Sequence, residues 1–130
     1  MIAVDTNVLA RYLLNDDPEQ AKAAARLLSG RERIDIPLSV WLELVWVLQI
    51  NDCGHPEIIR GLRHIIGLPG VRPRALDVFL YALRWYEQGM DFGDALHLAM
   101  SAGYERFASF DKAMAKSAAR IGASPQVARP

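Results

Sequence analysis

The chain is poor in the residues that build disulfides and zinc sites. Its 130 residues include one cysteine, Cys53, and three histidines, His55, His64 and His97. A lone cysteine forms no internal disulfide and excludes zinc sites made of two or four cysteines. The histidines are too scattered along the chain to form a histidine-rich zinc site. We therefore expect a protein of a reducing compartment, the cytoplasm.

The chain also lacks net charge and long apolar runs. It has 15 Lys and Arg residues and 15 Asp and Glu residues, which excludes nucleic-acid binding through bulk positive charge alone. The longest near-apolar run, residues 36–50, is interrupted by Pro37 and Glu43, so we expect no membrane span. The amino-terminal segment carries Asp5 and no basic stretch, which is unlike a signal peptide.

The length and hydrophobic content indicate one packed domain. Hydrophobic residues make up 52% of the chain, which is enough for a core and argues against disorder. Compact domains most often contain about 100–150 residues. We expect a single domain over residues 1–123, followed by a short, loose tail over residues 124–130.

Short apolar runs alternate with segments of helical periodicity. The strand candidates are residues 2–4, 34–36 and 106–109, with Val71-Arg72 as a further short one. The predicted helices cover residues 6–14, 18–28, 38–50, 56–66, 74–87, 92–102 and 112–120. This alternation indicates parallel strands joined by helical crossovers. We predict a helix-rich, three-layer α/β/α domain with a short-stranded, twisted parallel sheet.

Several acidic residues stand at predicted helix starts. Asp5 and Asp111 each end an apolar strand and precede a helix. Each could cap the helix with its carboxylate, or serve as a ligand at the carboxyl end of a parallel strand. Asp91 and Asp94 flank another helix start, where Asp91 fits a cap and Asp94 a first-turn acid. His97, one turn after Asp94, fits a residue of the core or its rim.

Glu43 stands in a helix that is apolar on almost every side, within the run VWLELVWVL of residues 40–48. We therefore expect the Glu43 carboxylate to be buried. Burial of an unpaired carboxylate costs several kcal/mol, so Glu43 would need a cation, either an arginine or a metal ion.

A single site to which all four acidic residues contribute would explain their positions in the sequence. Carboxyl ends of parallel strands meet at one edge of a sheet, which would place Asp5 and Asp111 near Asp94 and Glu43. Four neighbouring carboxylates do not all ionise without a compensating charge. Oxygen ligands without thiolates suit Mg²⁺ or Mn²⁺. The sequence therefore predicts a divalent metal centre.

The motifs that carry these acids resemble those of PIN domains. The run VDTNVL at residues 4–9 is similar to the opening motif of that family. Glu43, Asp94 and the turn at residues 109–111 follow in the family's order, and the likeness covers essentially the whole chain. The ordered set is most similar to VapC-type ribonuclease toxins of bacterial toxin–antitoxin pairs.

The resemblance implies a PIN fold and a Mg²⁺-dependent endoribonuclease, in which Mn²⁺ could substitute. Such an enzyme hydrolyses RNA phosphodiesters, in tRNA or another structured RNA, with metal-activated water. The resemblance assigns the catalytic roles to Asp5, Glu43, Asp94 and Asp111, with Asp5 and Asp94 as metal ligands. It gives supporting roles to Thr6, Asn7, Asp91 and Ser109, of which Ser109 stands where the family usually has threonine.

The resemblance also implies partners. It predicts a homodimer, a cognate VapB-type antitoxin that occludes the site, and a larger assembly of toxin and antitoxin. Among the 12 arginines, the candidates for contact with RNA phosphates are Arg11, Arg72, Arg74 and Arg106. Aromatic residues on the helices are candidates for the core or for a partner groove.

Four alternatives differ in class. A haloacid-dehalogenase-type phosphatase would need a second aspartate where Asn7 stands, and a longer chain. A response-regulator receiver domain would need a mid-chain acid at a strand end, whereas Glu43 is predicted to be helical. The other two are a catalytically silent PIN-like scaffold that binds RNA or protein, and a DNA-directed PIN nuclease.

Overall fold

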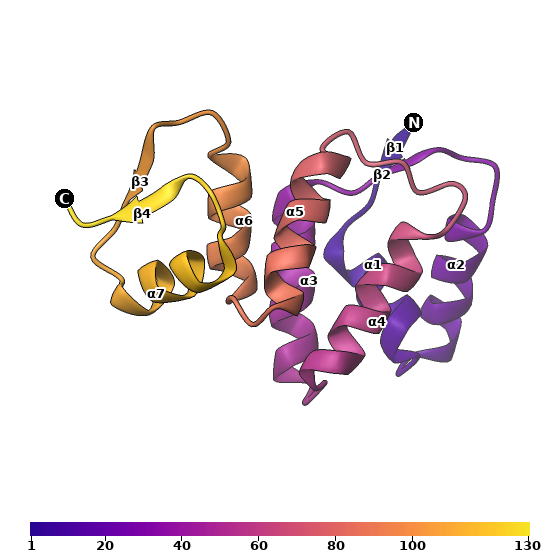
Figure 1. Cartoon of the computed structure of the whole chain (residues 1–130). Helices are drawn as coiled ribbons and strands as arrows, with labels where there is room; N and C mark the ends of the chain where they lie inside the picture. Colours follow the sequence, from indigo (N-terminus) through magenta and orange to yellow (C-terminus); the bar gives the residue numbers. More distant parts are fainter. The chain divides into compact units, whose positions relative to one another are not determined.

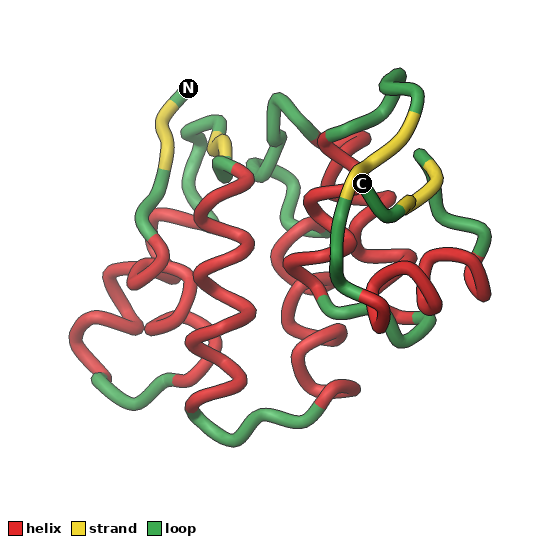
Figure 2. Tube along the Cα trace, turned by 90° about the vertical axis from the view of Figure 1, so that its left-hand side faces the viewer, coloured by secondary structure: helices red, strands yellow, loops and turns green.

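A computed structural model describes all 130 residues, which form two compact units, Met1–Leu76 and Asp77–Pro130. Helices account for most of the trace and the strands are very short (Figure 2). The chain has seven helices and four strands, and each unit contains one two-stranded parallel sheet.

The first unit contains four helices and a small parallel sheet (Figure 1). Its elements are β1 (Ile2–Ala3), α1 (Thr6–Leu14), α2 (Pro18–Leu28), β2 (Ile34–Asp35), α3 (Leu38–Ile50) and α4 (His55–Ile66). In the sheet, Ile2 lies opposite Ile34, and Val71 adds a parallel bridge to Ile34. The short strand candidate at Val71 is therefore confirmed as a bridge.

The core of the first unit forms between its helices. Leu9 of α1, Trp41 of α3 and Leu62 of α4 are fully buried. Gly70 is also part of the packing, because a β-carbon there would lie 2.9 Å from the backbone oxygen of Glu32. The loop that contains Gly70 therefore lies directly against the loop that precedes β2.

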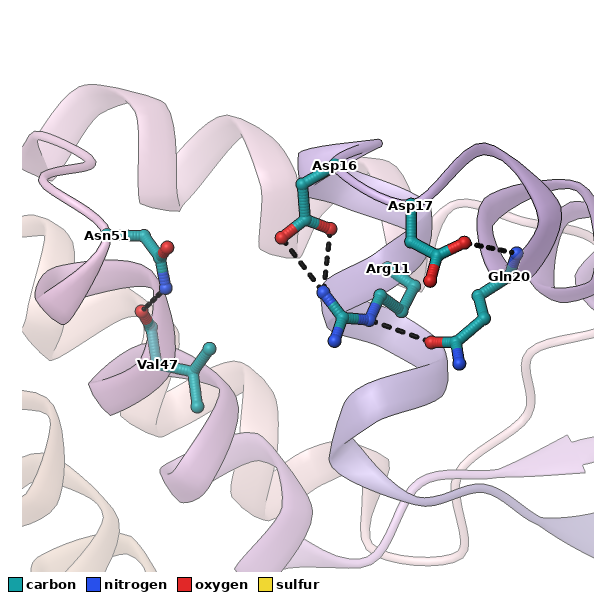
Figure 3. Close-up of polar contacts among 6 residues, drawn as sticks. All are labelled: Arg11, Asp16, Asp17, Gln20, Val47 and Asn51. Atoms are coloured by element: carbon teal, nitrogen blue, oxygen red, sulfur yellow. Dashed lines mark hydrogen bonds and ion pairs between the residues drawn. The ribbon is translucent and has the colours of Figure 1, made fainter.

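Polar side chains fix the helix ends of the first unit, as Figure 3 shows. Asp17 caps α2, since its Oδ1 accepts a hydrogen bond from the Gln20 N–H at 3.2 Å. The Arg11 guanidinium donates to Asp16 and to Gln20 Oε1, each at 2.9 Å. At the end of α3, the Asn51 side chain donates to a backbone oxygen one turn earlier.

The second unit contains α5 (Leu76–Glu87), which begins at the unit boundary, and four further elements. These are α6 (Phe92–Met100), β3 (Arg106–Ala108), α7 (Lys112–Ile121) and β4 (Gln126–Ala128). The parallel strands β3 and β4 lie side by side, with Phe107 opposite Val127 (Figure 1). The expectation that residues 124–130 are loose is wrong for β4, because pairing with β3 orders the backbone of this strand.

The predicted fold class, a helix-rich α/β protein with short parallel strands, is confirmed. The ranges predicted for α1, α2 and α3 match the structure. Helix α5 begins at Leu76 rather than Arg74, and the Arg74 N–H instead donates to Asp35 Oδ1 at 2.8 Å. No helix has both the length and the apolar character needed to cross a bilayer. The single-domain boundary at residue 123 stays a prediction.

Candidate active site

Asp5 links the end of β1 to the start of α1. Its backbone is extended, and its Oδ1 accepts a hydrogen bond from the Thr6 N–H at 2.8 Å. Asp5 is exposed, whereas Thr6 is buried at 2% exposure. The cap uses one carboxylate oxygen, and a carboxylate has lone pairs on both oxygens, so capping leaves Asp5 able to bind a cation.

Asp91 and Asp94 form one structural motif at the start of α6. Asp91 Oδ2 accepts a hydrogen bond from the Asp94 N–H at 3.1 Å. Partial burial of Asp94 raises the pKa of its carboxyl, and the negative charges of Asp91 and Asp111 raise this pKa further, while His97 lowers it. Asp91 and Asp111 are therefore both near enough to Asp94 to disfavour its ionised form.

Asp111 caps α7 after a turn that Ser109 stabilises. Asp111 Oδ1 accepts from the Met114 N–H at 3.0 Å, and the Asp111 N–H donates to Ser109 Oγ at 3.0 Å. Ser109 is itself held by β4, because its N–H donates to the Ala128 oxygen at 3.0 Å. The Ser109 hydroxyl thus helps to hold the backbone of Asp111, a predicted catalytic residue.

The expectation that Glu43 is buried is wrong, because the side chain is exposed. Helix α3 buries Trp41, Leu44, Val45 and Leu48. Its opposite face leaves apolar side chains in solvent, with Leu42, Trp46 and Ile50 exposed at 37%, 61% and 56%. Glu43 is on a partly solvated helix, so no desolvation cost requires a cation beside it. Its catalytic role stays a prediction.

The chain matches the PIN domain family over residues 2–120. It belongs to the PIN-domain family. The match extends over both units and includes every residue predicted for the site. Comparisons with curated proteins and with solved structures found no match. The PIN domain is a nuclease fold, and its members typically use divalent metal ions.

The PIN-domain acids of the second unit fit such an ion by their chemistry. No lysine or arginine forms an ion pair with Asp91, Asp94 or Asp111; the arginine salt bridges at Asp16 and Glu105 lie elsewhere. Their donors are carboxylate oxygens, which Mg²⁺ and Mn²⁺ prefer. Within either unit, no three His, Cys, Asp or Glu side chains are already arranged as a metal cage. The structure therefore shows carboxylates of suitable chemistry that no lysine or arginine pairs with.

The remaining predicted residues lie in different surroundings. Asn7 is exposed on α1 and lines a cavity of about 280 Å³ between α1 and α2. His97 is exposed, and its ring stacks on Phe107 with centroids 6.2 Å apart, which confirms a position at the rim. Among the arginine candidates, Arg11 is bound to Asp16, whereas Arg72 and Arg74 are exposed.

The structure brings together Asp91, Asp94 and Asp111 in the second unit, while Asp5 and Glu43 belong to the first. Sequence reasoning missed Asp35, which ends β2 much as Asp5 follows β1. The same strand-then-acid pattern would have found Asp35. Sequence reasoning also missed Arg129, which lies over the Phe110 ring, and only the pairing of β4 reveals that contact.

Proposed function

We propose that this PIN-domain protein is a Mg²⁺-dependent endoribonuclease, with Mn²⁺ able to substitute. The observation that carries the proposal is the cluster of Asp91, Asp94 and Asp111, none of which forms an ion pair with a lysine or an arginine. A divalent ion would place positive charge beside these carboxylates, and the nuclease family indicates the class of reaction.

Asp5 and Asp94 would hold the ion, and Glu43 and Asp111 would complete the acidic set. When bound, the ion would lower the pKa of a water and offset charge on the phosphodiester as it reacts. The chain itself contributes orientation: capping hydrogen bonds fix the carboxylates of Asp5 and Asp111 on their helix ends. Because water attacks rather than the ribose 2′-OH, we expect 5′-phosphate and 3′-hydroxyl products.

In the cell, we propose the role of a VapC-type toxin in a cytoplasmic toxin–antitoxin pair. The order of the acidic motifs along the chain supports this assignment. The expected partners are a VapB-type antitoxin and a second copy of the chain, in a dimer or a larger assembly. Two surfaces of the first unit suit such partners: the cavity between α1 and α2, and the exposed row of Leu42, Trp46 and Ile50.

Asp5→Asn tests the proposal, because asparagine caps a helix as well as aspartate does but lacks the charge. We expect the variant to fold and to lose RNA cleavage. The matched control is Asp17→Asn, which alters the cap of α2 outside the acidic set. Full cleavage by a folded Asp5→Asn protein would refute the assignment.

Two further measurements separate the alternatives. Parallel assays on single-stranded RNA and DNA of the same sequence distinguish a ribonuclease from a DNA-directed enzyme. Calorimetric titration with Mg²⁺ or Mn²⁺ should give binding heat, which Asp94→Asn should reduce. A silent scaffold without a metal centre would give no heat and no cleavage.

A further inference from the structure

The residue before Asp111 is an aromatic ring in solvent. Phe110 is 71% exposed, in the turn between β3 and α7. The Arg129 guanidinium carbon lies 5.7 Å from the centroid of this ring, within the range of a cation–π contact. Phenylalanine normally stabilises a protein through burial, whereas this ring is left free to contact a ligand beside a predicted catalytic acid.

Backbone pairing holds the ring and the guanidinium at the same place. Ala108 of β3 lies opposite Ala128 of β4, and the Ser109 N–H donates to the Ala128 oxygen. Phe110 and Arg129 therefore both lie just beyond the carboxyl ends of two paired parallel strands. The Ser109 hydroxyl accepts from the Asp111 N–H, so the same turn also fixes the carboxylate.

A ring face and a guanidinium plane are the two protein surfaces on which unpaired RNA bases stack. Arginine also binds the phosphate of the same nucleotide in a forked geometry. We propose that Phe110 and Arg129 form a stacking site for one unpaired base of single-stranded RNA, next to the phosphodiester that is cleaved. This inference rests on the proposed ribonuclease function, to which it adds a substrate requirement for an unstacked base.

The residues around Phe110 favour RNA over a protein partner. Its neighbours in sequence, Ser109, Asp111 and Lys112, are polar or charged, and the Arg129 side chain over its ring is cationic. The cores of protein interfaces are instead depleted of charge and gather several apolar residues. A single ring can stack on one base, and a cationic side chain beside the ring can bind the phosphate of the same nucleotide.

The test is binding of a single-stranded RNA that carries the fluorescent base 2-aminopurine, whose emission falls when it stacks on a ring. Titration of the full chain in EDTA prevents metal-dependent hydrolysis. We expect Phe110→Ala to weaken binding about 5- to 150-fold and to abolish the quenching. Phe110→Trp should preserve both, and Arg129→Gln should weaken binding.

Tyr104→Ala is the matched control. Tyr104 is 70% exposed, but it precedes β3 and so lies at the strand's opposite end from Phe110. We expect this variant to bind RNA with unchanged affinity and quenching. Circular dichroism melts of every variant would show that the fold is retained.

The outcomes are distinguishable. If the wild-type chain binds RNA and Phe110→Ala binds it equally well, the stacking site is overturned while the ribonuclease proposal stands. If the wild-type chain neither binds nor cleaves RNA, the proposed ribonuclease function is refuted, and the stacking site is overturned with it. If Phe110→Ala instead lowers self-association in sedimentation with RNA affinity unchanged, Phe110 belongs to a protein interface and the inference is overturned.

Discussion

The carboxylate of Asp91 caps the helix that carries Asp94, through a hydrogen bond of 3.1 Å from the Asp94 N–H to Asp91 Oδ2. The two acids are therefore coupled, since the position of one fixes the first turn that presents the other. Asp5 and Asp111 also cap the helices that they precede. A helix amino terminus favours negative charge, so an aspartate is a suitable cap at each of these three positions.

Substitutions of Asp111 should separate its capping from its catalytic role. Asp111→Asn keeps a capping side chain, so we expect the free energy of unfolding to change by less than about 0.5 kcal/mol. RNA cleavage should fall by about 100-fold or more, as expected for loss of a charged group at the reacting centre. Asp111→Ala should lose the cap as well, at about 0.5–2 kcal/mol. Urea melts and a cleavage assay measure both, and an Asn variant of full activity would contradict the role.

Metal ions should stabilise the wild-type chain but not a variant without the Asp94 charge. Burial and the charges of Asp91 and Asp111 disfavour the ionised Asp94 carboxyl, so Asp94→Asn should raise the melting temperature in EDTA. Saturating Mg²⁺ should raise the melting temperature of the wild type through preferential binding to the native state. An equal Mg²⁺-dependent rise in Asp94→Asn would count against Asp94 as a ligand.

Glu43→Gln should affect activity without affecting stability. Glu43 is exposed, and exposed substitutions away from special features change stability by less than about 0.5 kcal/mol. If Glu43 belongs to the acidic centre, RNA cleavage falls while the urea midpoint stays the same. Gln49→Glu, an exposed change on the same helix, is the control for the charge of α3. Unchanged cleavage in Glu43→Gln would remove Glu43 from the catalytic set.

Gly70→Ala should destabilise the first unit. The new β-carbon would meet the Glu32 backbone oxygen at 2.9 Å, and backbone does not move aside as a side chain does. We expect a loss of about 1–3 kcal/mol in the free energy of unfolding. Gly61→Ala is the contrast, because its β-carbon would meet the flexible end of Leu13 at 3.2 Å within a helix that favours alanine. Equal losses in both variants would argue against the backbone contact.

Cys53 should alkylate slowly in the native chain. Burial raises the pKa of the Cys53 thiol, and the nearby charges of Glu57 and Asp52 raise it further. Since the native pKa is above the unfolded value, this thiol favours the native state below the unfolded pKa, and the benefit is lost as pH rises through the native pKa. Iodoacetamide should react faster with urea-unfolded protein at pH 8, and Glu57→Gln should accelerate the native reaction. Equal native and unfolded rates would contradict the shift.

Local signals allowed most helices to be predicted from the sequence. Asp17-Pro18 marks the start of α2, and the acids that follow apolar strands mark the starts of α1 and α7. The strand β4 has no comparable local signal, because three residues become a strand only through pairing with β3.

The candidate site was likewise predictable only where the local sequence determines the structure. Capping by Asp5, Asp91 and Asp111 follows from short-range sequence, and all three caps are present. The exposure of Glu43 depends on which side of α3 packs inward, and a helix apolar on all sides carries no signal for that choice.

The parallel pairing of β3 and β4 makes residues 126–130 part of the fold of the second unit. Proteolytic trimming or a deletion there would strip β3 of its hydrogen-bonding neighbour and expose its peptide groups to other molecules, a known route to aggregation. It would also release the Ser109 amide from its acceptor. A chain shortened at this end would therefore lose both a strand partner and an anchor of the turn before Asp111.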